Sequence, residues 1–143
     1  MKKINWLALA LVLALVLSGC GARLPALEDC VWVMSTLQSM EQEGQVIAYG
    51  EGGSSTLKTA RELRLTCRAT DGTLFLEDHT CGKQYEGTYR IYQKKAQSHI
   101  YQVTLEGITG FATVAMTEYA DGTQKATLAV QVGEYAGTFF PEP

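Results

Sequence analysis

Closely spaced turn signals divide most of this sequence into short segments, and this rhythm restricts the folds open to it. Five pairs of residues that contain glycine punctuate the chain between positions 71 and 134. Glycine adopts a positive φ at little cost, as tight hairpins require. Segments of this length with short loops are typical of an antiparallel meander, a barrel or a sandwich. We predict eight strands, at Val31–Leu37, Leu63–Arg68, Thr73–Asp78, Tyr85–Tyr92, His99–Glu106, Gly110–Glu118, Gln124–Val132 and Tyr135–Phe140.

Within these segments the hydrophobic residues alternate with polar ones. Tyr101, Val103 and Leu105 share one face of their segment, while its intervening residues are polar. One buried face and one wet face is typical of antiparallel sheet. No helical period is sustained from Leu63 onward, so the predicted class is all-β.

The segment Gln38–Ala60 interrupts this rhythm. It contains an apolar patch, Val46–Tyr49, followed by a run rich in glycine and serine. We interpret it as a long connection, with a short helical or extended piece around Thr56–Arg61. The competing interpretation is a ninth strand at Val46–Tyr49. Loops of this length in compact domains are usually functional or mobile.

Length and charge exclude several classes of protein. At 143 residues the chain has room for one domain. Its net charge of −3 argues against nucleic acid as a partner, because such binding uses a basic surface. A hydrophobic fraction of 46% argues against intrinsic disorder.

The amino terminus has the pattern of an export signal. Lys2 and Lys3 precede the apolar run Ile4–Leu17, which is shorter than the roughly 20 residues of a membrane-spanning helix. The residues Leu17-Ser18-Gly19-Cys20 that follow resemble the bacterial lipobox. This resemblance implies that a diacylglyceryl group is attached to Cys20, that the chain is cut before it, and that the new amino terminus receives an acyl chain such as palmitate.

These features predict three regions. Residues 1–19 are a lipoprotein signal peptide, residues 20–28 are a lipidated cysteine with a short tether, and residues 29–143 are the folded domain. The predicted location is the extracytoplasmic face of the cell membrane. Loss of Lys2 and Lys3 takes the net charge from −3 to −5, and anionic headgroups repel that sign. We therefore expect the lipid on Cys20 to be the only membrane contact.

The folded domain resembles the lipocalin-like barrel. Trp32 opens the first strand, a long connection follows, and seven strands run on in hairpins. In that family the tryptophan lies near the closed end, and the long first loop covers the open end. The glycine that the family places two residues before the tryptophan is Cys30 here. The resemblance implies an antiparallel meander of about eight strands that closes into a barrel.

A closed barrel of eight strands either fills with side chains or holds one small ligand. We expect large residues to point inward and mostly fill it, while Gly87 and Gly137 leave room for a cavity. The candidate interior or ligand-contacting residues are Trp32, Leu65, Tyr89, Tyr101, Met116 and Phe139, together with Leu76, Leu105 and Leu128.

Three cysteines remain once Cys20 is lipidated, and they allow one disulfide. Cys30 starts one strand and Cys67 ends its antiparallel neighbour, so both lie at the same end. Cys81 lies one strand of six residues further on, about 20 Å away at ~3.3 Å per residue, whereas a disulfide needs Cα atoms within about 7 Å. The expected pair is Cys30–Cys67. A ninth strand would favour Cys30–Cys81, and three free thiols are the remaining alternative.

Motifs for catalysis or metal binding are weak. Residues 77–81 gather acids, His79 and Cys81, but a structural zinc site draws its ligands from two clusters. A nucleophilic pair of Cys81 and His79 has no third group to orient it. We predict no cofactor, no metal and no enzymatic activity.

Two functions fit this sequence. The first is a membrane-anchored, non-catalytic binding module for a small apolar or envelope-derived ligand. The alternative is a protein-interaction or hydrolase-inhibitor lipoprotein with a filled barrel and an exposed aromatic patch. Tyrosines on the polar face, such as Tyr92, would contribute to such a surface.

Overall fold

The computed structural model describes residues 23–50 and 60–143. The predicted signal peptide, Cys20 and most of the piece at Thr56–Arg61 lie outside these residues. Within them no helix reaches the length and hydrophobicity needed to cross a membrane.

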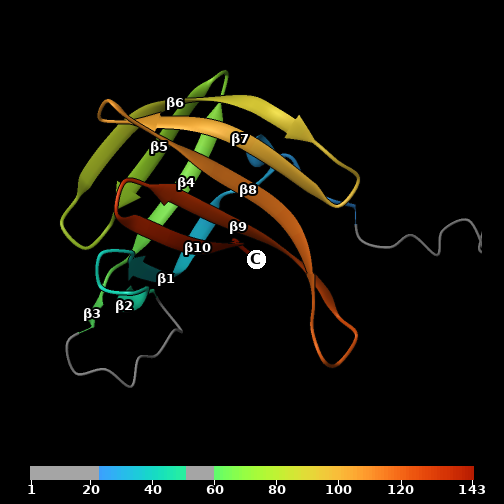
Figure 1. Ribbon diagram of the computed structural model, residues 1–143, viewed down its shortest axis with the longest axis horizontal. Helices are drawn as coiled ribbons and strands as arrows, with labels where there is room; N and C mark the ends of the chain where they lie inside the picture. The colour runs from blue at the N-terminus through green and yellow to red at the C-terminus, as the bar shows by residue number, and fades with distance from the viewer. Residues whose placement is uncertain (1–22, 51–59) are drawn as a thin grey trace, which may run out of the picture.

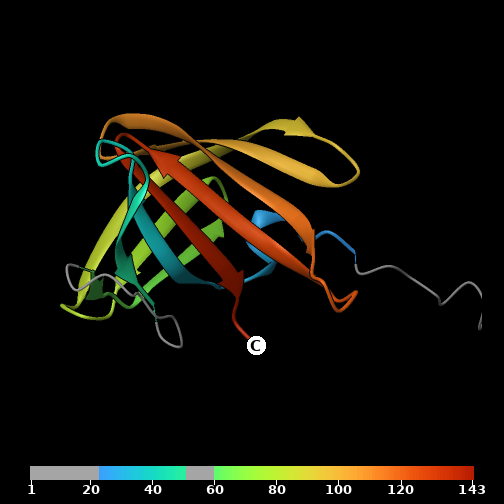
Figure 2. The same ribbon diagram turned by 60° about the horizontal axis from the view of Figure 1, so that its bottom comes forward.

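The described chain is a closed antiparallel β-barrel (Figures 1 and 2). A short 3-10 helix, η1 (Leu27–Asp29), precedes the strands. The strands are β1 (Trp32–Ser39), β2 (Gln45–Tyr49), β3 (Arg61–Glu62), β4 (Leu65–Thr70), β5 (Thr73–Asp78), β6 (Lys83–Lys94), β7 (Ser98–Leu105), β8 (Ile108–Glu118), β9 (Gln124–Val132) and β10 (Tyr135–Pro141). Strand β1 and strands β4 to β10 form the eight-stranded barrel, which the pairing of β10 with β1 closes. The predicted class and all eight predicted strands are confirmed.

Strand β2 is an addition to this barrel, so the apolar patch at Val46–Tyr49 is a strand and not part of a loop. The first half of β1 pairs with β4, with Trp32 opposite Cys67. Its second half pairs with β2, with Thr36 opposite Tyr49. Strand β3 runs parallel to β2. Strand β2 therefore lies between the second half of β1 and strand β3. It adds a strand to the sheet only beside that half of β1.

The exchange of partners along β1 depends on Gly50. Its amide donates a hydrogen bond to the carbonyl of Ser35 at 2.8 Å, and a β-bulge interrupts the pairing of β1 with β10 between Met34 and Thr36. A Cβ at position 50 would lie 1.8 Å from the carbonyl oxygen of Met34. Only glycine lets the chain cross β1 this closely.

We therefore expect Gly50→Ala to lower the free energy of unfolding by about 1–3 kcal/mol, the usual range for overpacking. Urea denaturation followed by circular dichroism measures the change. Gly137→Ala is the comparison, because its Cβ would meet the ring edge of Phe139 at 2.8 Å and not a backbone oxygen. A Gly50→Ala variant as stable as the parent would show that the chain at position 50 passes β1 with room for a side chain.

The two ends of the barrel differ. At one end η1 plugs the interior: Leu27 is fully buried, its amide donates to the Tyr101 hydroxyl at 3.1 Å, and its carbonyl accepts from the Trp32 indole at 2.9 Å. Leu27 thus packs with the folded domain, which was expected to begin at residue 29. We call this the closed end. The other end, where the β1–β2, β5–β6, β7–β8 and β9–β10 hairpins turn, is the open end.

Candidate functional site

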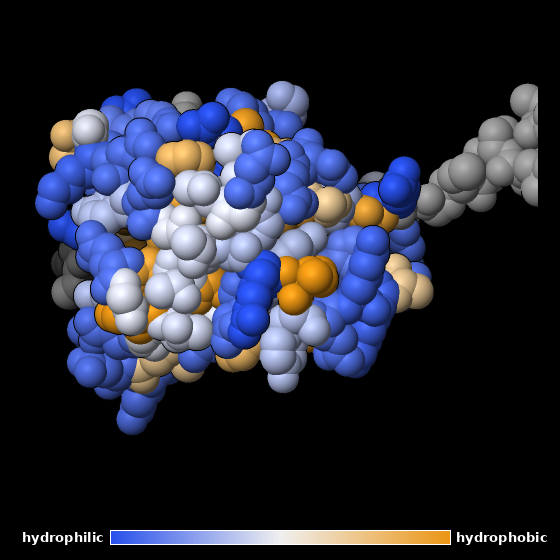
Figure 3. Space-filling model, turned by 90° about the horizontal axis from the view of Figure 1, so that it is seen from above, coloured by the Kyte–Doolittle hydropathy of each residue, from blue (hydrophilic) through white to orange (hydrophobic). Residues whose placement is uncertain are grey.

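The open half of the barrel contains a hollow of about 420 Å³. Pockets of about 300–1,000 Å³ are the size that holds a small-molecule ligand. Figure 3 shows hydrophobic residues in a recess at the left, where these hairpins lie. Most of the lining is aliphatic or aromatic. It comprises Leu37, Ile47, Leu63, Leu65, Leu76, Tyr85, Leu105, Ile108, Val130, Val132, Tyr135, Gly137 and Phe139, with Arg61, Asp78 and Glu106 as charged members.

One glycine helps to keep this half empty. Gly137 lies opposite Leu37 on one side and Val130 on the other, and it adds no side chain between them. Gly87 was expected to do the same, but it has another role. A Cβ there would lie 2.2 Å from the carbonyl oxygen of Thr104. Gly87 therefore allows two strands to approach closely, and it does not line the hollow.

The closed half is filled by large side chains. Trp32 is fully buried, and Tyr101 is 4% exposed. The ring centroids of Tyr89 and Tyr101 are 6.1 Å apart, edge to face, and the Tyr89 hydroxyl donates a hydrogen bond to Glu28 at 2.8 Å. Burial, together with that carboxylate, raises the pKa of Tyr89 to about 12. The barrel is thus half filled and half hollow.

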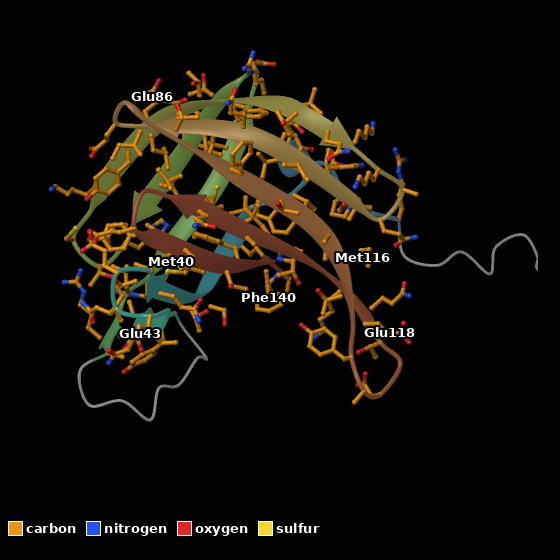
Figure 4. All side chains as sticks on the ribbon, viewed as in Figure 1. Met40, Glu43, Glu86, Met116, Glu118 and Phe140 are labelled. Carbon is orange, nitrogen blue, oxygen red and sulfur yellow. The ribbon has the colours of Figure 1, made fainter. Side chains whose placement is uncertain are left out.

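The candidate interior residues therefore divide between the two halves. Leu65 and Phe139 line the hollow, as do Leu76 and Leu105. Trp32, Tyr89, Tyr101 and Leu128 belong to the packed core or contact it, and so does Met116, which Figure 4 shows on β8. Sequence reasoning missed Ile47, which falls in the segment Gln38–Ala60 interpreted as a connection, and Arg61, which ends the short piece expected around Thr56–Arg61. The apolar patch at 46–49 was the signal that could have found Ile47.

Charged groups at the open end are available to orient a ligand. Asp78 accepts hydrogen bonds from the Thr80 amide at 2.9 Å and from Cys81 Sγ at 3.2 Å. Slight burial acts to raise the pKa of Asp78, but the hydrogen bonds from Cys81 and Thr80 outweigh it and hold the pKa below its usual value. Arg61 makes no ion pair with any residue in the described ranges.

Two hairpins are joined at the rim of the open end. The Met40 amide donates to the carbonyl of Glu134 at 2.6 Å, and Figure 4 shows Met40 and Glu43 on the β1–β2 hairpin. The carboxyl groups of Glu41 and Glu134 share a hydrogen bond, and this bond, with the charge of Glu134, raises the pKa of Glu41 above its ordinary value of 4.5. Such a bond requires one carboxyl group to keep its proton.

This contact predicts a pH dependence. A raised pKa in the folded state means that the protonated form stabilises the contact. Its contribution is complete below the ordinary pKa and is lost as the pH rises through the raised one. In Glu134→Gln the amide can donate to an ionised Glu41, so we expect the pKa of Glu41 to fall. NMR titration of the Glu41 carboxyl group measures this. An unchanged pKa would show that Glu134 is not the cause.

The predicted disulfide between Cys30 and Cys67 is not formed, since Cys30, Cys67 and Cys81 are all free thiols in the structure. Trp32 stands directly opposite Cys67, so Cys30, two residues earlier, is only a diagonal neighbour. Burial raises the pKa of Cys67 to about 12, which keeps it a protonated, unreactive thiol at neutral pH. The extra strand β2 does not bring Cys81 to Cys30, because β1 still pairs with β4.

Residues 77–81 form a polar turn. Within the described residues no three side chains of His, Cys, Asp or Glu are placed to hold a metal ion. His79 Nε2 lies 2.9 Å from Thr66 Oγ1 and 3.8 Å from Glu77 Oε2. A catalytic triad needs the two ring nitrogens of the histidine to face different partners. Here both partners meet the same nitrogen, so this cluster lacks the geometry of a triad.

A second, more open recess lies outside the barrel. It has a volume of about 540 Å³ and lies between the β8–β9 hairpin and the carboxyl-terminal residues. Its lining includes Tyr119, Lys125 and Phe140, and Figure 4 shows Phe140 beside this hairpin. Seven residues line this recess, against sixteen for the hollow, so it encloses a ligand less completely than the hollow does.

Fold and site together define a class: a small antiparallel barrel of eight strands, consistent with a lipocalin-like barrel, that is plugged at one end and hollow at the other. Comparison with protein-family models, with curated proteins and with solved structures finds no match.

Proposed function

We propose that this protein is a membrane-anchored, extracytoplasmic lipoprotein whose barrel binds a small apolar ligand. The observation that carries this proposal is the hollow of about 420 Å³ in the open half. Side chains fill small barrels unless there is a ligand to accommodate. The alternative, a protein-interaction module, was expected to have a filled barrel, and the hollow half favours the ligand.

The lining indicates the chemistry of the ligand. Contacts with Leu65, Val130 and Phe139 favour an apolar body, and the volume suits one chain or one small ring system. Arg61, Asp78 and Glu106 would meet the polar group of a ligand whose apolar part is buried. Because both signs of charge are present, the site favours an amphiphile over a pure hydrocarbon.

Direct binding tests this proposal. The neutral fluorophore N-phenylnaphthylamine brightens in apolar surroundings, so titration into the full chain should give a saturable increase with one site per chain. Dodecanol, a single-chain amphiphile, should displace it. A response that rises without saturation, or a bound fluorophore that dodecanol does not displace, would contradict ligand binding in the hollow.

Lipidation of Cys20 rests on the lipobox resemblance alone. Mass spectrometry of the chain expressed in a bacterium should give an amino-terminal Cys20 that carries diacylglyceryl. Cys20→Ser should leave the signal peptide attached, because serine offers no thiol for the lipid. An unmodified Cys20 in an otherwise processed chain would contradict the anchor and leave the ligand proposal intact.

A further inference from the structure

Besides Tyr119 at the β8–β9 turn, the exposed large hydrophobic residues form two groups, and ligand binding accounts for only one of them. Met40, Ile108 and Tyr135 lie at the open end, beside the hollow. Far from it, Ile91 is 53% exposed and Tyr92 is 63% exposed, both on β6. Tyr92 packs edge to face on Phe111 of β8 with ring centroids 5.3 Å apart. The hollow gives no reason for this second group.

The second group lies on a hairpin that projects from the barrel. Strand β5 pairs with β6 only as far as Thr88, whereas β6 continues to Lys94 with β7 as its partner. Figures 1 and 2 both show this β6–β7 hairpin extending beyond β5, with the β8–β9 hairpin extending on the same side of the barrel. In Figure 3 a small hydrophobic patch is exposed above β6 and β7 among hydrophilic residues. We call residues 90–98 the projecting hairpin.

The charge of the projecting hairpin is opposite to that of the whole molecule. From Gly87 to Leu105 the sequence contains no aspartate or glutamate, and it contains Arg90, Lys94 and Lys95. The complete chain has a net charge of −3. Lys94 and Lys95 are exposed at the turn, where the Lys95 amide donates to the Ser98 carbonyl at 2.9 Å. The basic charge is thus concentrated beside the exposed Ile91 and Tyr92.

The projecting hairpin also lies at the closed end. Its turn follows the end of β6 that is distant from the hollow, and Tyr101 on β7 contacts η1 through the Leu27 amide. In Figures 1 and 2 the described chain begins, in blue before η1, on this side of the barrel. The chain that leads back to Cys20 therefore leaves the barrel at the end where the basic and hydrophobic residues project.

We propose that the projecting hairpin rests on an anionic lipid surface. Lysines attract anionic headgroups, and tyrosine beside an aliphatic residue suits the interface between headgroups and acyl chains. A second copy of this chain would bring the same positive charges together, which disfavours a symmetric dimer through this surface. The expectation that the lipid on Cys20 is the sole membrane contact followed from the net charge, which averages over this basic stretch of β6 and β7.

A depth measurement tests this inference. The full chain carries Trp6→Phe, so that Trp32, which is fully buried, gives the only native tryptophan signal. Tyr92→Trp then reports on the projecting hairpin, and Ile108→Trp at the open end is the matched control. Each variant is bound to vesicles of phosphatidylcholine, with or without phosphatidylglycerol, and brominated lipid is used as the quencher. Flotation shows that the chain is bound in every sample.

We expect brominated lipid to quench the indole introduced by Tyr92→Trp in vesicles that contain phosphatidylglycerol, and to leave the indole introduced by Ile108→Trp unaffected. Lys94→Glu with Lys95→Glu should reduce the quenching at position 92 by more than about tenfold, because each lysine favours the anionic surface. Three results would overturn the proposal. Quenching could be equal at positions 92 and 108, it could be absent at both positions in chains that float with the vesicles, or it could be unchanged by Lys94→Glu with Lys95→Glu. Each of these results leaves the proposed ligand binding untouched, because the fluorophore titration measures it separately.

Discussion

Replacement of Trp32 by alanine is expected to lower the free energy of unfolding by about 3–5 kcal/mol, the usual cost of truncating a large buried aromatic residue. Trp32 is fully buried, and its indole donates the hydrogen bond that fixes the Leu27 carbonyl of η1 at 2.9 Å. The substitution removes the packing and leaves that carbonyl without its donor. Against a typical total of about 5–15 kcal/mol, this is a large fraction of the stability. Urea denaturation followed by circular dichroism measures it.

Trp32→Phe separates the two contributions. The phenyl ring keeps most of the packing but cannot donate a hydrogen bond to the Leu27 carbonyl. We therefore expect the free energy of unfolding of Trp32→Phe to lie between those of the parent and of Trp32→Ala. A Trp32→Ala variant that loses less than about 1 kcal/mol would show that the closed end does not depend on the plug.

Filling the hollow is the second large effect, and it is expected to abolish ligand binding. Val130 lines the hollow and is 8% exposed. Its partners across the sheet are Ala112 and Gly137, both with little or no side chain. In Val130→Trp the indole can spread over these two positions and occupy the space of the ligand. We expect affinity for N-phenylnaphthylamine to fall at least tenfold, which corresponds to about 1.4 kcal/mol.

Gln131→Trp is the matched control, because the next residue on β9 is exposed and faces outward opposite Phe111. It introduces the same side chain at almost the same height of the barrel without entering the hollow. Binding should match that of the parent. If Val130→Trp binds the fluorophore as tightly as the parent does, the fluorophore occupies another place, such as the recess beside Phe140.

The strands could be predicted because their signals are local. Alternation along segments such as 99–106 and glycine in the turns are set by a few neighbouring residues, so each strand is recognisable without its partners. Strand β2 was harder, because its five residues lie among glutamate and glycine. Its place in the sheet also depends on the bulge in β1 and on the close crossing at Gly50, which are contacts between distant parts of the chain.

The hollow could be predicted only in part, for a related reason. Alternation shows which residues point inward, and Leu65 and Phe139 were found in this way. Whether the interior is filled depends on which inward residues share one level of the barrel. Trp32, Tyr89 and Tyr101 gather at the level of η1, while Gly137 faces Leu37 and Val130 at the other. That sorting follows from the register of all eight strands, which no single segment encodes.

The plug formed by η1 has a consequence for how cargo would arrive. In a chain held to a bilayer through Cys20, the sealed floor of the barrel faces the membrane and the entrance faces the aqueous compartment. A guest molecule could not slide sideways from the supporting leaflet into the barrel. It would have to cross water as a monomer or be handed over by a carrier, so delivery would be limited by the solubility of the guest or by collision with its donor.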